Sequence, residues 1–315
     1  MTSDRPTPDR PLRIGTRGSP LALAQAHETR ARLMAAGDLP EAAFEIVVIK
    51  TTGDRVLDRP LKEIGGKGLF TREIEDALLS GGIDVAVHSM KDMPTEQPDG
   101  LSIVCYLPRE DVRDAFVAPG GGTIDDLPEG AVVGTSSLRR RAQLAHRRPD
   151  LTLVEFRGNV QTRMRKLADG VAQATFLAMA GLNRLGMDDV PRRPIPPDTM
   201  RPAVAQGAIG IECRTDDTAM RDRLAAIHDR DTGLRLDCER AFLRRLDGSC
   251  ETPIAGLATL NDGRLRFDGE ILRPDGSDRL AEGGAADAAD GAALGAELAQ
   301  RLLDRAPAGF FDWRA

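Results

Sequence analysis

Residues 12–37 read LRIGTRGSPLALAQAHETRARLMAAG, and this stretch decides how the fold begins. Leu12–Thr16 is predicted to be a buried strand. Ser19 followed by Pro20 predicts the start of a helix, because serine caps helix N-termini and proline fits the first helical position. Gly37 predicts the end of that helix. The backbone N–H groups at the helix start favour anion binding, although an ordinary strand–turn–helix connection would have the same pattern.

The alternation of apolar runs with amphipathic stretches continues over the first two-thirds of the chain and predicts an α/β fold. A glycine-rich break at residues 119–123 separates two halves that are candidates for similar folds. Further strands are predicted over residues 44–50, 83–88, 101–107, 131–134, 151–156 and 175–179. Further helices are predicted over residues 69–80 and 160–168, and from a cap at Thr135 or Ser136 towards Arg148.

The last third of the chain has a different character. Five prolines in residues 191–202 mark a linker or an ordered irregular loop. Beyond it the pattern predicts helices over residues 218–229 and 234–246, a loop over residues 247–252, and a hairpin turning at Asn261-Asp262-Gly263. An alanine-rich helix is predicted from about residue 287 to about residue 304. These elements predict a separate, smaller α/β unit.

Composition narrows the class of protein. The 315 residues are 41% hydrophobic and 29% charged, which is typical of a folded chain of two or three domains. The net charge of −6 disfavours nucleic-acid binding. Of the 43 basic residues five are lysines, so 43 − 5 = 38 are arginines. That excess indicates either a general compositional bias or recognition of several carboxylates or phosphates, which suit the planar guanidinium group.

The termini and the cysteines point to a reducing compartment. Residues 1–11 are polar and proline-containing, and we expect a disordered tail with no signal peptide. No apolar run reaches the length of a membrane span. The four cysteines form no C-x-x-C pair and the four histidines are scattered, so we expect neither a metal site nor disulfides. A cytoplasmic protein fits these features best.

Two polar motifs lie in the first half. Gly65-Gly66-Lys67-Gly68 lacks the full P-loop pattern, so a nucleotide site is disfavoured and an anion-contacting loop is preferred. Residues 88–94, HSMKDMP, follow a predicted strand, and ligands of open α/β sheets bind at such strand ends. Lys91 and Asp92 could form a surface pair of little consequence. In a cleft, Asp92 could instead hold a substrate N–H group and stabilise nearby positive charge.

The strongest signal lies in the second half. Residues 134–140, GTSSLRR, place Arg139 and Arg140 in the first turn of a predicted helix, where the helix dipole disfavours cations unless an anion binds there. Arg157 follows the next strand, and Arg163 lies about one turn into the next helix. Each buried guanidinium–carboxylate bond contributes roughly 1.5–3 kcal/mol, so several would hold a polyanionic ligand firmly.

Cys250 is predicted to lie in a loop of small residues after a helix, and we expect it to be more exposed than most cysteines. Lone cysteines are usually packing residues, and no histidine lies nearby in sequence to activate this one. Its spacing alone gives little reason to assign it a nucleophilic role.

Taken together, these motifs resemble those of the porphobilinogen deaminase family in type and order. The matching segments are Gly15–Ala22 (GTRGSPLA), Gly65–Phe70 (GGKGLF), Val87–Pro94 (VHSMKDMP), Val133–Arg140 (VGTSSLRR), Arg157–Val160 (RGNV) and the loop of Cys250. The resemblance extends from about Leu12 to the end of the chain, although beyond about Gly256 it rests on the layout of elements rather than on motifs.

The resemblance implies three domains. Two would be lobes like the halves of a type II periplasmic binding protein, and the third would be a smaller α/β domain that carries the cofactor cysteine. The implied bounds are residues 12–107 with 208–227 for domain 1, residues 108–207 for domain 2 and residues 228–315 for domain 3. Residues 1–11 remain the expected tail.

The implied cofactor is dipyrromethane, two linked pyrrole rings held by a thioether to Cys250, with no metal. The implied reaction is a transferase step of porphyrin and haem biosynthesis: four porphobilinogen molecules condense with loss of ammonia into the linear tetrapyrrole hydroxymethylbilane. Asp92 would bind pyrrole N–H groups and stabilise cationic intermediates. Lys67 would close over the growing chain. Carboxylates would be held by Arg17, Lys91, Arg139, Arg140, Arg157, Arg163 and Arg184, with neutral hydrogen bonds from Ser19, Ser137 and Gln206.

Three positions depart from the family pattern. Ala205 stands where glycine is usual, which would be costly if the backbone there has a positive φ. Glu63 lies where many members have a second lysine, and Gln173 lies where aspartate is common. These departures affect loop details rather than the implied reaction.

Other classes fit less well. A non-catalytic anion-binding protein of the periplasmic type would not need a third domain with a cysteine, and a transcription-factor effector domain would follow a basic helix-turn-helix. The expected partner is the small molecule porphobilinogen. Neither a nucleic acid nor a membrane is expected as a partner, and a monomer is implied by the resemblance.

Overall fold

The first β-sheet of the molecule takes its strands from two distant parts of the chain. The computed structural model describes residues 5–55, 71–248 and 252–314. The chain divides into two compact units. Unit 1 comprises Met1–Glu110 with Gly207–Gly233, and unit 2 comprises Asp111–Gln206 with Leu234–Ala315. The return of residues 207–233 to unit 1 places a late strand inside a sheet that is otherwise built from the first 106 residues.

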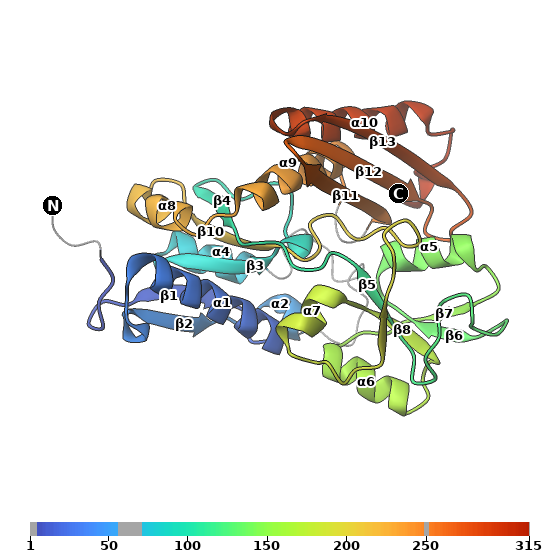
Figure 1. Cartoon of the computed structure of the whole chain (residues 1–315), viewed down its shortest axis with the longest axis horizontal. Helices are drawn as coiled ribbons and strands as arrows, with labels where there is room; N and C mark the ends of the chain where they lie inside the picture. Colours follow the sequence, from blue (N-terminus) through green and yellow to red (C-terminus); the bar gives the residue numbers. More distant parts are fainter. Residues whose placement is uncertain (1–4, 56–70, 249–251, 315) are drawn as a thin grey trace. The chain divides into compact units, whose positions relative to one another are not determined.

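Unit 1 contains a five-stranded sheet of order β2-β1-β3-β10-β4 (Figure 1). Strands β1, β2 and β3 are parallel, whereas β10 runs antiparallel to both of its neighbours. The elements of unit 1 are β1 (Leu12–Thr16), α1 (Pro20–Gly37), η1 (Glu41–Ala43), β2 (Phe44–Val48), α2 (Thr52–Arg55), α4 (Arg72–Leu79), β3 (Val85–Ser89), η2 (Met90–Asp92), β4 (Leu101–Tyr106), β10 (Ile209–Arg214) and α8 (Thr218–Ala225).

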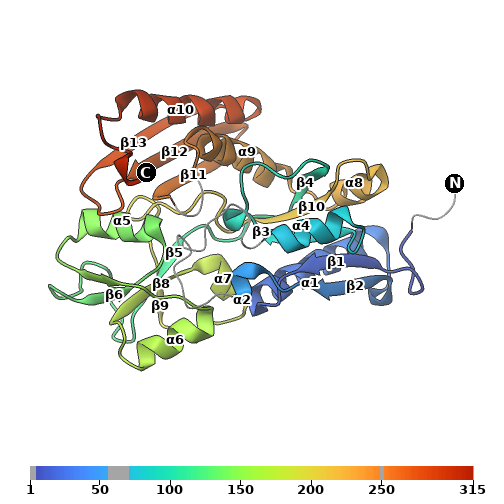
Figure 2. The same cartoon turned by 180° about the vertical axis from the view of Figure 1, so that it is seen from behind.

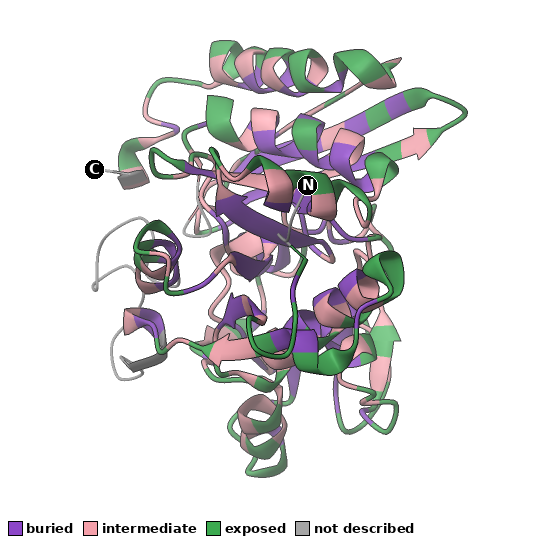
Figure 3. Cartoon of the chain, turned by 90° about the vertical axis from the view of Figure 1, so that its left-hand side faces the viewer, coloured by how far each residue is buried: buried purple, intermediate pink, exposed green. Residues whose placement is uncertain are grey.

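Helices cover both faces of this sheet (Figures 1 and 2). Leu33 of α1 and Leu224 of α8 pack with Val85 and Val87 in one core cluster. On the other face, Ile74 and Leu78 of α4 pack with Ala86. The strands are largely buried and the outer helix faces exposed (Figure 3), so side chains reach a ligand mainly at the strand ends.

The start of α1 confirms the sequence prediction. Ser19 is the N-cap, and its Oγ accepts a hydrogen bond of 3.3 Å from the backbone N–H of Ala22. The helix ends at Gly37, and the following Asp38 takes the left-handed conformation with its N–H bonded to the carbonyl of Met34. Aspartate tolerates this conformation because its short polar side chain bonds locally.

Unit 2 contains a second five-stranded sheet of order β7-β6-β8-β5-β9, with the same pattern of directions as the first. Strands β6, β7 and β8 are parallel, and β5 is antiparallel to β8 and β9. The two sheets therefore confirm the expectation of similar halves. Their elements are β5 (Asp114–Val117), β6 (Val132–Gly134), α5 (Leu138–Arg147), β7 (Thr152–Val154), α6 (Val160–Ala168), β8 (Ala174–Ala178), α7 (Met179–Arg184) and β9 (Arg192–Pro194).

Three strands of the two five-stranded sheets were missed by the sequence patterns. Strand β5 has four residues and begins with a buried aspartate, Asp114, which breaks the apolar run. Strand β9 lies in the proline-rich segment, which suits an edge strand. Strand β10 contains the fully buried Glu212. In β5 and β10, partners from other strands and helices compensate the buried charge. A charged residue in the sequence usually predicts an exposed position, so these strands were not recognised.

The rest of unit 2 is a three-stranded antiparallel sheet of order β11-β12-β13 with helices beside it. The predicted hairpin turn is confirmed, since Asp262 and Gly263 both have positive φ, 48° and 74°. Strand β13, rich in alanine and glycine, was not predicted. The elements are α9 (Arg230–Arg245, which begins in unit 1), β11 (Ile254–Asn261), β12 (Arg264–Leu272), β13 (Arg279–Asp287), η3 (Ala288–Asp290), α10 (Gly291–Arg305) and η4 (Asp312–Arg314).

The N-terminal segment is described from Arg5 onward. Thr7 and Arg10 pair through backbone hydrogen bonds, and the guanidinium of Arg5 donates to the carbonyls of Gly37 and Asp38 at the end of α1. Residues 5–11 of the expected tail therefore contact unit 1. Among the described residues, no helix has the length and apolar character needed to cross a membrane.

The backbone at Ala205 has a positive φ of 60°, which is the conformation that would explain why glycine is usual at this position in the family. Its side chain is buried, and its N–H donates to the carboxylate of Glu239 at 2.6 Å.

A left-handed backbone costs a non-glycine residue roughly 1–2 kcal/mol. Losing one buried methyl group costs about 0.8 kcal/mol. We therefore expect Ala205→Gly to raise the free energy of unfolding by about 0.5 kcal/mol in urea denaturation, and Ala205→Val to lower it, because a β-branched residue is strained at positive φ. Equal stabilities of the three proteins would contradict this account.

Candidate functional site

The strand ends of unit 1 surround a small hollow of about 80 Å³. Three of the predicted site residues line it: Arg17, Ser19 and Asp92. Arg17 and Ser19 follow β1, and Asp92 lies in η2 directly after β3. Because β1 and β3 are parallel neighbours, their carboxyl ends meet at one edge of the sheet. The sheet therefore brings together residues that are about seventy-five positions apart in the sequence.

Two neutral side chains in the same hollow were not predicted. Gln25 on α1 and Ser89 at the end of β3 bond to each other through both Gln25 amide atoms, at 2.8 and 3.1 Å. Gln25 is buried, with 3% of its surface exposed. A glutamine on the buried face of a predicted helix is the sequence signal that could have identified it. The pair fixes the positions of polar atoms in the wall of the hollow.

Lys91 and Asp92 form part of the short 3-10 turn η2. Both side chains are half-buried, and Asp92 faces the hollow that Arg17 also lines. Asp92 provides a carboxylate and Arg17 a guanidinium, so the hollow offers one acceptor for N–H groups and one donor for carboxylates. This combination suits a ligand that carries both kinds of group.

Unit 2 contains a buried cluster of charge around Asp114. Asp114, at the start of β5, is fully buried, and its Oδ1 accepts from the guanidinium of Arg140 at 2.7 Å. A guanidinium nitrogen of Arg139 lies 2.8 Å from Oδ2. The amide of Gln206 donates to Oδ1 at 2.9 Å and to the carbonyl of Val112 at 2.8 Å. The cationic surroundings lower the pKa of Asp114 despite its burial, so the carboxylate is charged.

The anion expected beside Arg139 and Arg140 is thus partly supplied by the protein itself. The helix α5 that carries them is capped by Ser137, whose Oγ accepts from the N–H of Arg140, and not by Thr135 or Ser136 as the sequence predicted. Ser136 instead accepts from the backbone N–H of Phe156 at 2.9 Å. The local conflict between two arginines and the helix N-terminus is resolved by Asp114, which comes from a different strand.

One carboxylate does not balance the positive charge in this region. Arg163 on α6 and Arg140 both direct a guanidinium nitrogen at the carbonyl of Phe176, at 3.5 and 2.9 Å. Burial and the nearby charge of Arg140 lower the pKa of Arg163 to about 10. We call Arg139, Arg140 and Arg163 the arginine cluster. Its excess of two positive charges over Asp114 predicts an anionic ligand.

Unsatisfied atoms support this inference. Among the described residues, the Nε atoms of both Arg139 and Arg140 are buried without a hydrogen-bond partner. Glu270 adds a weaker attraction to Arg139, but it already pairs with Arg201 and Arg279. Carboxylates of a ligand would compensate the surplus charge of the cluster. The donor set of unit 2 therefore fits a group bearing acetate and propionate side chains.

The remaining predicted site residues are Arg157, Arg184, Lys67 and Cys250. Arg157 follows β7 and Arg184 ends α7, and both are half-buried. The backbone carbonyl of Arg157 accepts from the ammonium of Lys166 at 3.0 Å. Lys67 and Cys250 lie outside the described residues, as does Glu63.

The other three cysteines are unsuited to nucleophilic chemistry. Cys105, Cys213 and Cys238 are buried, and burial raises the pKa of their thiols to about 12, 11 and 12 respectively. A thiol with so high a pKa carries almost no thiolate at neutral pH, and the thiolate is the reactive form.

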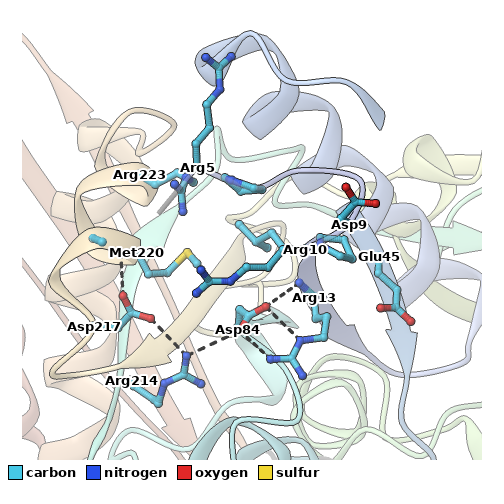
Figure 4. A pocket seen from close by; sticks show the side chains of 14 residues that line it. Arg5, Asp9, Arg10, Arg13, Glu45, Asp84, Arg214, Asp217, Met220 and Arg223 are labelled. Carbon is cyan, nitrogen blue, oxygen red and sulfur yellow. Dashed lines mark hydrogen bonds and ion pairs between the residues drawn. The ribbon is translucent and has the colours of Figure 1, made fainter. Parts of the chain in front are cut away.

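A larger hollow of about 450 Å³ lies elsewhere in unit 1, at the start of β1, and contains none of the predicted site residues (Figure 4). Asp84 lies at its base and binds Arg13 through both the backbone N–H and the guanidinium. Arg214 contacts Asp84 and Asp217. Arg13, Asp84, Arg214 and Asp217 therefore form a structural ion network in the wall of this hollow.

Comparison with known proteins identifies the family. Residues 12–222 match the model described as "Porphobilinogen deaminase, dipyromethane cofactor binding domain", and residues 234–304 match "Porphobilinogen deaminase, C-terminal domain". The chain belongs to the porphobilinogen deaminase family. Like other porphobilinogen deaminases it is a transferase that makes tetrapyrroles from porphobilinogen with a dipyrromethane cofactor.

The relatives cover nearly the whole chain. A porphobilinogen deaminase of Paracoccus denitrificans is 72% identical over 308 residues, which is 98% of each chain. A chloroplastic porphobilinogen deaminase of Pisum sativum is 54% identical over 96% of this chain and 83% of its own. Among solved structures, an arginine-specific periplasmic binding protein of Salmonella typhimurium aligns at a TM-score of 0.39 and 15% identity, over 70% of this chain and 93% of its own. That similarity is too weak to support a further conclusion.

Proposed function

We propose that the chain condenses four porphobilinogen molecules head to tail, with loss of ammonia, and releases hydroxymethylbilane after one hydrolysis. The surplus positive charge of the arginine cluster is the observation that carries this proposal. Each pyrrole unit of the product has an acetate and a propionate, so a site for several such units needs more guanidinium groups than internal carboxylates. Asp92, which lines the hollow of unit 1 together with Arg17, adds an acceptor for pyrrole N–H groups.

The residues around Asp114 have two roles in this proposal. Arg139 and Arg163 bind ligand carboxylates, together with Arg17, Lys91, Arg157 and Arg184. Arg140 and Gln206 hold Asp114 through direct hydrogen bonds, and they orient the cluster while contributing charge and polarity to it. Ser19 and Ser137 cap helices whose N-termini add N–H donors. Lys67 contacts the growing chain.

Asp92 supplies a fixed negative charge. When ammonia leaves porphobilinogen, positive charge develops on the substrate ring, and a carboxylate already in place stabilises it without reorganising. Dipyrromethane, when bound, supplies the free pyrrole carbon to which the first substrate unit is joined. Asp92 also orients each ring by accepting from its pyrrole N–H.

Cys250 is proposed as the attachment point of the cofactor. The thiols of Cys105, Cys213 and Cys238 are buried and have raised pKa values, which makes them poor nucleophiles. A thioether on any of them would also displace packed core. Cys250 lies outside the described residues, and in the sequence it directly follows the small residues Gly248 and Ser249.

The test of Asp92 is its replacement by asparagine. Asp92→Asn keeps the size and the hydrogen-bonding atoms but removes the charge, so we expect kcat to fall by about 10²–10³-fold. The intact mass should still show the bound cofactor. Asp99→Asn, an exposed aspartate seven residues further on, is the matched control and should leave kcat unchanged. Loss of less than threefold in Asp92→Asn would contradict the assigned role.

We also propose a cytoplasmic monomer that acts on a small molecule without a nucleic-acid or membrane partner. The net charge of −6 disfavours nucleic-acid binding. Sedimentation equilibrium of the purified chain should give the mass of one copy.

A further inference from the structure

A buried histidine lies at the floor of the hollow in unit 1. His88 on β3 is 5% exposed, and its Nε2 lies 3.1 Å from Oε2 of Glu212 on the neighbouring strand β10. The Glu212 side chain is fully buried. A histidine paired with a buried carboxylate is held in one ring orientation and one tautomer. His88 also lines the hollow together with Asp92 and Arg17.

A second buried carboxylate belongs to α4, which packs against the same sheet. Glu75 on α4 is 8% exposed. Burial and the nearby charge of Glu212 raise the pKa of Glu75. The ionisable groups around His88 are therefore Glu212 from β10, Glu75 from α4, Arg17 after β1 and Asp92 in η2.

The bond to Glu212 decides which nitrogen can react. A carboxylate accepts, so Nε2 carries the proton of the neutral ring, and Nδ1 is left with a lone pair. This is the arrangement in which a carboxylate orients a histidine as a general base. The roles proposed for Asp92, Arg17 and the arginine cluster do not involve Nδ1 of His88.

The reaction requires a proton acceptor distinct from Asp92. When a pyrrole α-carbon forms the new carbon–carbon bond, its carbon–hydrogen bond must break, and the electron pair of that bond restores the aromatic ring. If Asp92 took the proton, it would become neutral and lose the charge that stabilises the next cationic substrate ring. A separate base keeps Asp92 ionised through every addition.

We propose that Nδ1 of His88 accepts the proton released from the pyrrole α-carbon at each condensation, and that Glu212 is the positioning residue for this imidazole. The proton then passes to solvent or leaves with ammonia as ammonium, so each cycle returns His88 to its neutral form. The proposal rests on the place given to Asp92 in the proposed function.

Porphobilinogen deuterated at its free α-carbon tests the proton transfer. In His88→Gln, which can keep a hydrogen bond to Glu212 but has no basic nitrogen, we expect the rate of chain elongation to fall by about 10²-fold. The deuterium isotope effect on elongation should rise from near 1 to at least about 3, because carbon–hydrogen cleavage becomes rate-limiting. A purely structural role would lower the rate without moving the isotope effect, and that result would overturn the proposal.

His27→Gln is the matched control. His27 lies on the exposed surface of α1 in the same unit, so its replacement should change neither the rate nor the isotope effect. Intact mass should show the same cofactor content in wild type, His88→Gln and His27→Gln. This measurement separates failure of the proton transfer from failure of cofactor assembly, which would instead count against the proposed function.

The tautomer of the His88 ring can be determined by NMR without measuring activity. Long-range ¹H–¹⁵N NMR of the histidine rings, with the His88 signals assigned by through-bond correlation to the His88 backbone in the wild-type protein, should show protonated Nε2 and unprotonated Nδ1. Glu212→Gln should weaken this preference and lower the elongation rate by about 10-fold with a raised isotope effect. A ring protonated at Nδ1 in the wild-type protein would overturn the proposal even if the variants fail to fold.

Discussion

Cys250→Ala is expected to yield a folded chain that carries no cofactor and has no deaminase activity. The wild-type mass should exceed the sequence mass by two porphobilinogens less two ammonias, and the variant should have the bare sequence mass. The reason is chemical: a thioether needs a reactive thiol, and the thiols of the other three cysteines are buried with raised pKa values. Electrospray mass spectrometry of the intact protein measures this directly.

Cys105→Ala provides the control for the cofactor experiment. Cys105 lies in the core of unit 1, so its loss should lower stability slightly and leave the mass surplus intact. If Cys250→Ala keeps the surplus, or if the wild-type chain gains none after incubation with porphobilinogen, Cys250 is not the attachment point. A binding protein without a covalent cofactor would then explain the site better.

Asp114→Asn is expected to cause the largest loss of stability among the charged residues of unit 2. The substitution leaves Arg139 and Arg140 buried without their shared carboxylate, at 4% and 5% exposure. Removing one partner from a buried ion pair costs about 3–5 kcal/mol, because the remaining charge stays desolvated. Urea denaturation of the cofactor-free chain should show this loss as a lower midpoint with an unchanged slope.

The same pair predicts how stability depends on pH. The arginines lower the pKa of Asp114 in the folded chain. A carboxylate with a depressed folded pKa stabilises the fold above its unfolded pKa, near 4, and this contribution is lost as the pH falls towards the folded value. The stability difference between wild type and Asp114→Asn should therefore be constant near neutral pH and shrink below about pH 4.

Asp125→Asn is the matched control for Asp114. Asp125 makes a two-point contact with Arg147, at 2.7 and 3.1 Å, but this pair is exposed. Exposed pairs contribute at most about 1 kcal/mol, so this variant should remain close to the wild type. Similar losses in the two variants would mean that burial does not decide the strength of the Asp114 contacts.

Several elements could be predicted because their causes are local. Ser19 and Pro20 specify the start of α1, and Asp262-Gly263 specifies a turn whose φ values are positive. The cost of alanine at position 205 was also visible once the family pattern required glycine there. In each case the deciding interaction lies within a few residues of the sequence signal.

The missed features depend on partners far away in the chain. Strand β10 is interrupted in its apolar pattern by Glu212, and only the contact with His88, 124 residues earlier, explains a buried carboxylate there. The burial of Asp114 is likewise explained only by its contact with Arg140, 26 residues later. The periodicity of apolar residues cannot predict that a charged residue is buried when the partner that neutralises it lies on a distant part of the chain.

By itself, the sequence determined the family, the α/β class and the residue types that a polycarboxylate pyrrole ligand needs, because these follow from local motifs and their order. Only the tertiary structure decided which arginines are neutralised by Asp114, which surplus charge is left for a ligand, and which nitrogen of His88 is directed away from Glu212. Those outcomes depend on distance and burial, since the strength of a charge interaction is set by how close its partners lie and how little water screens them.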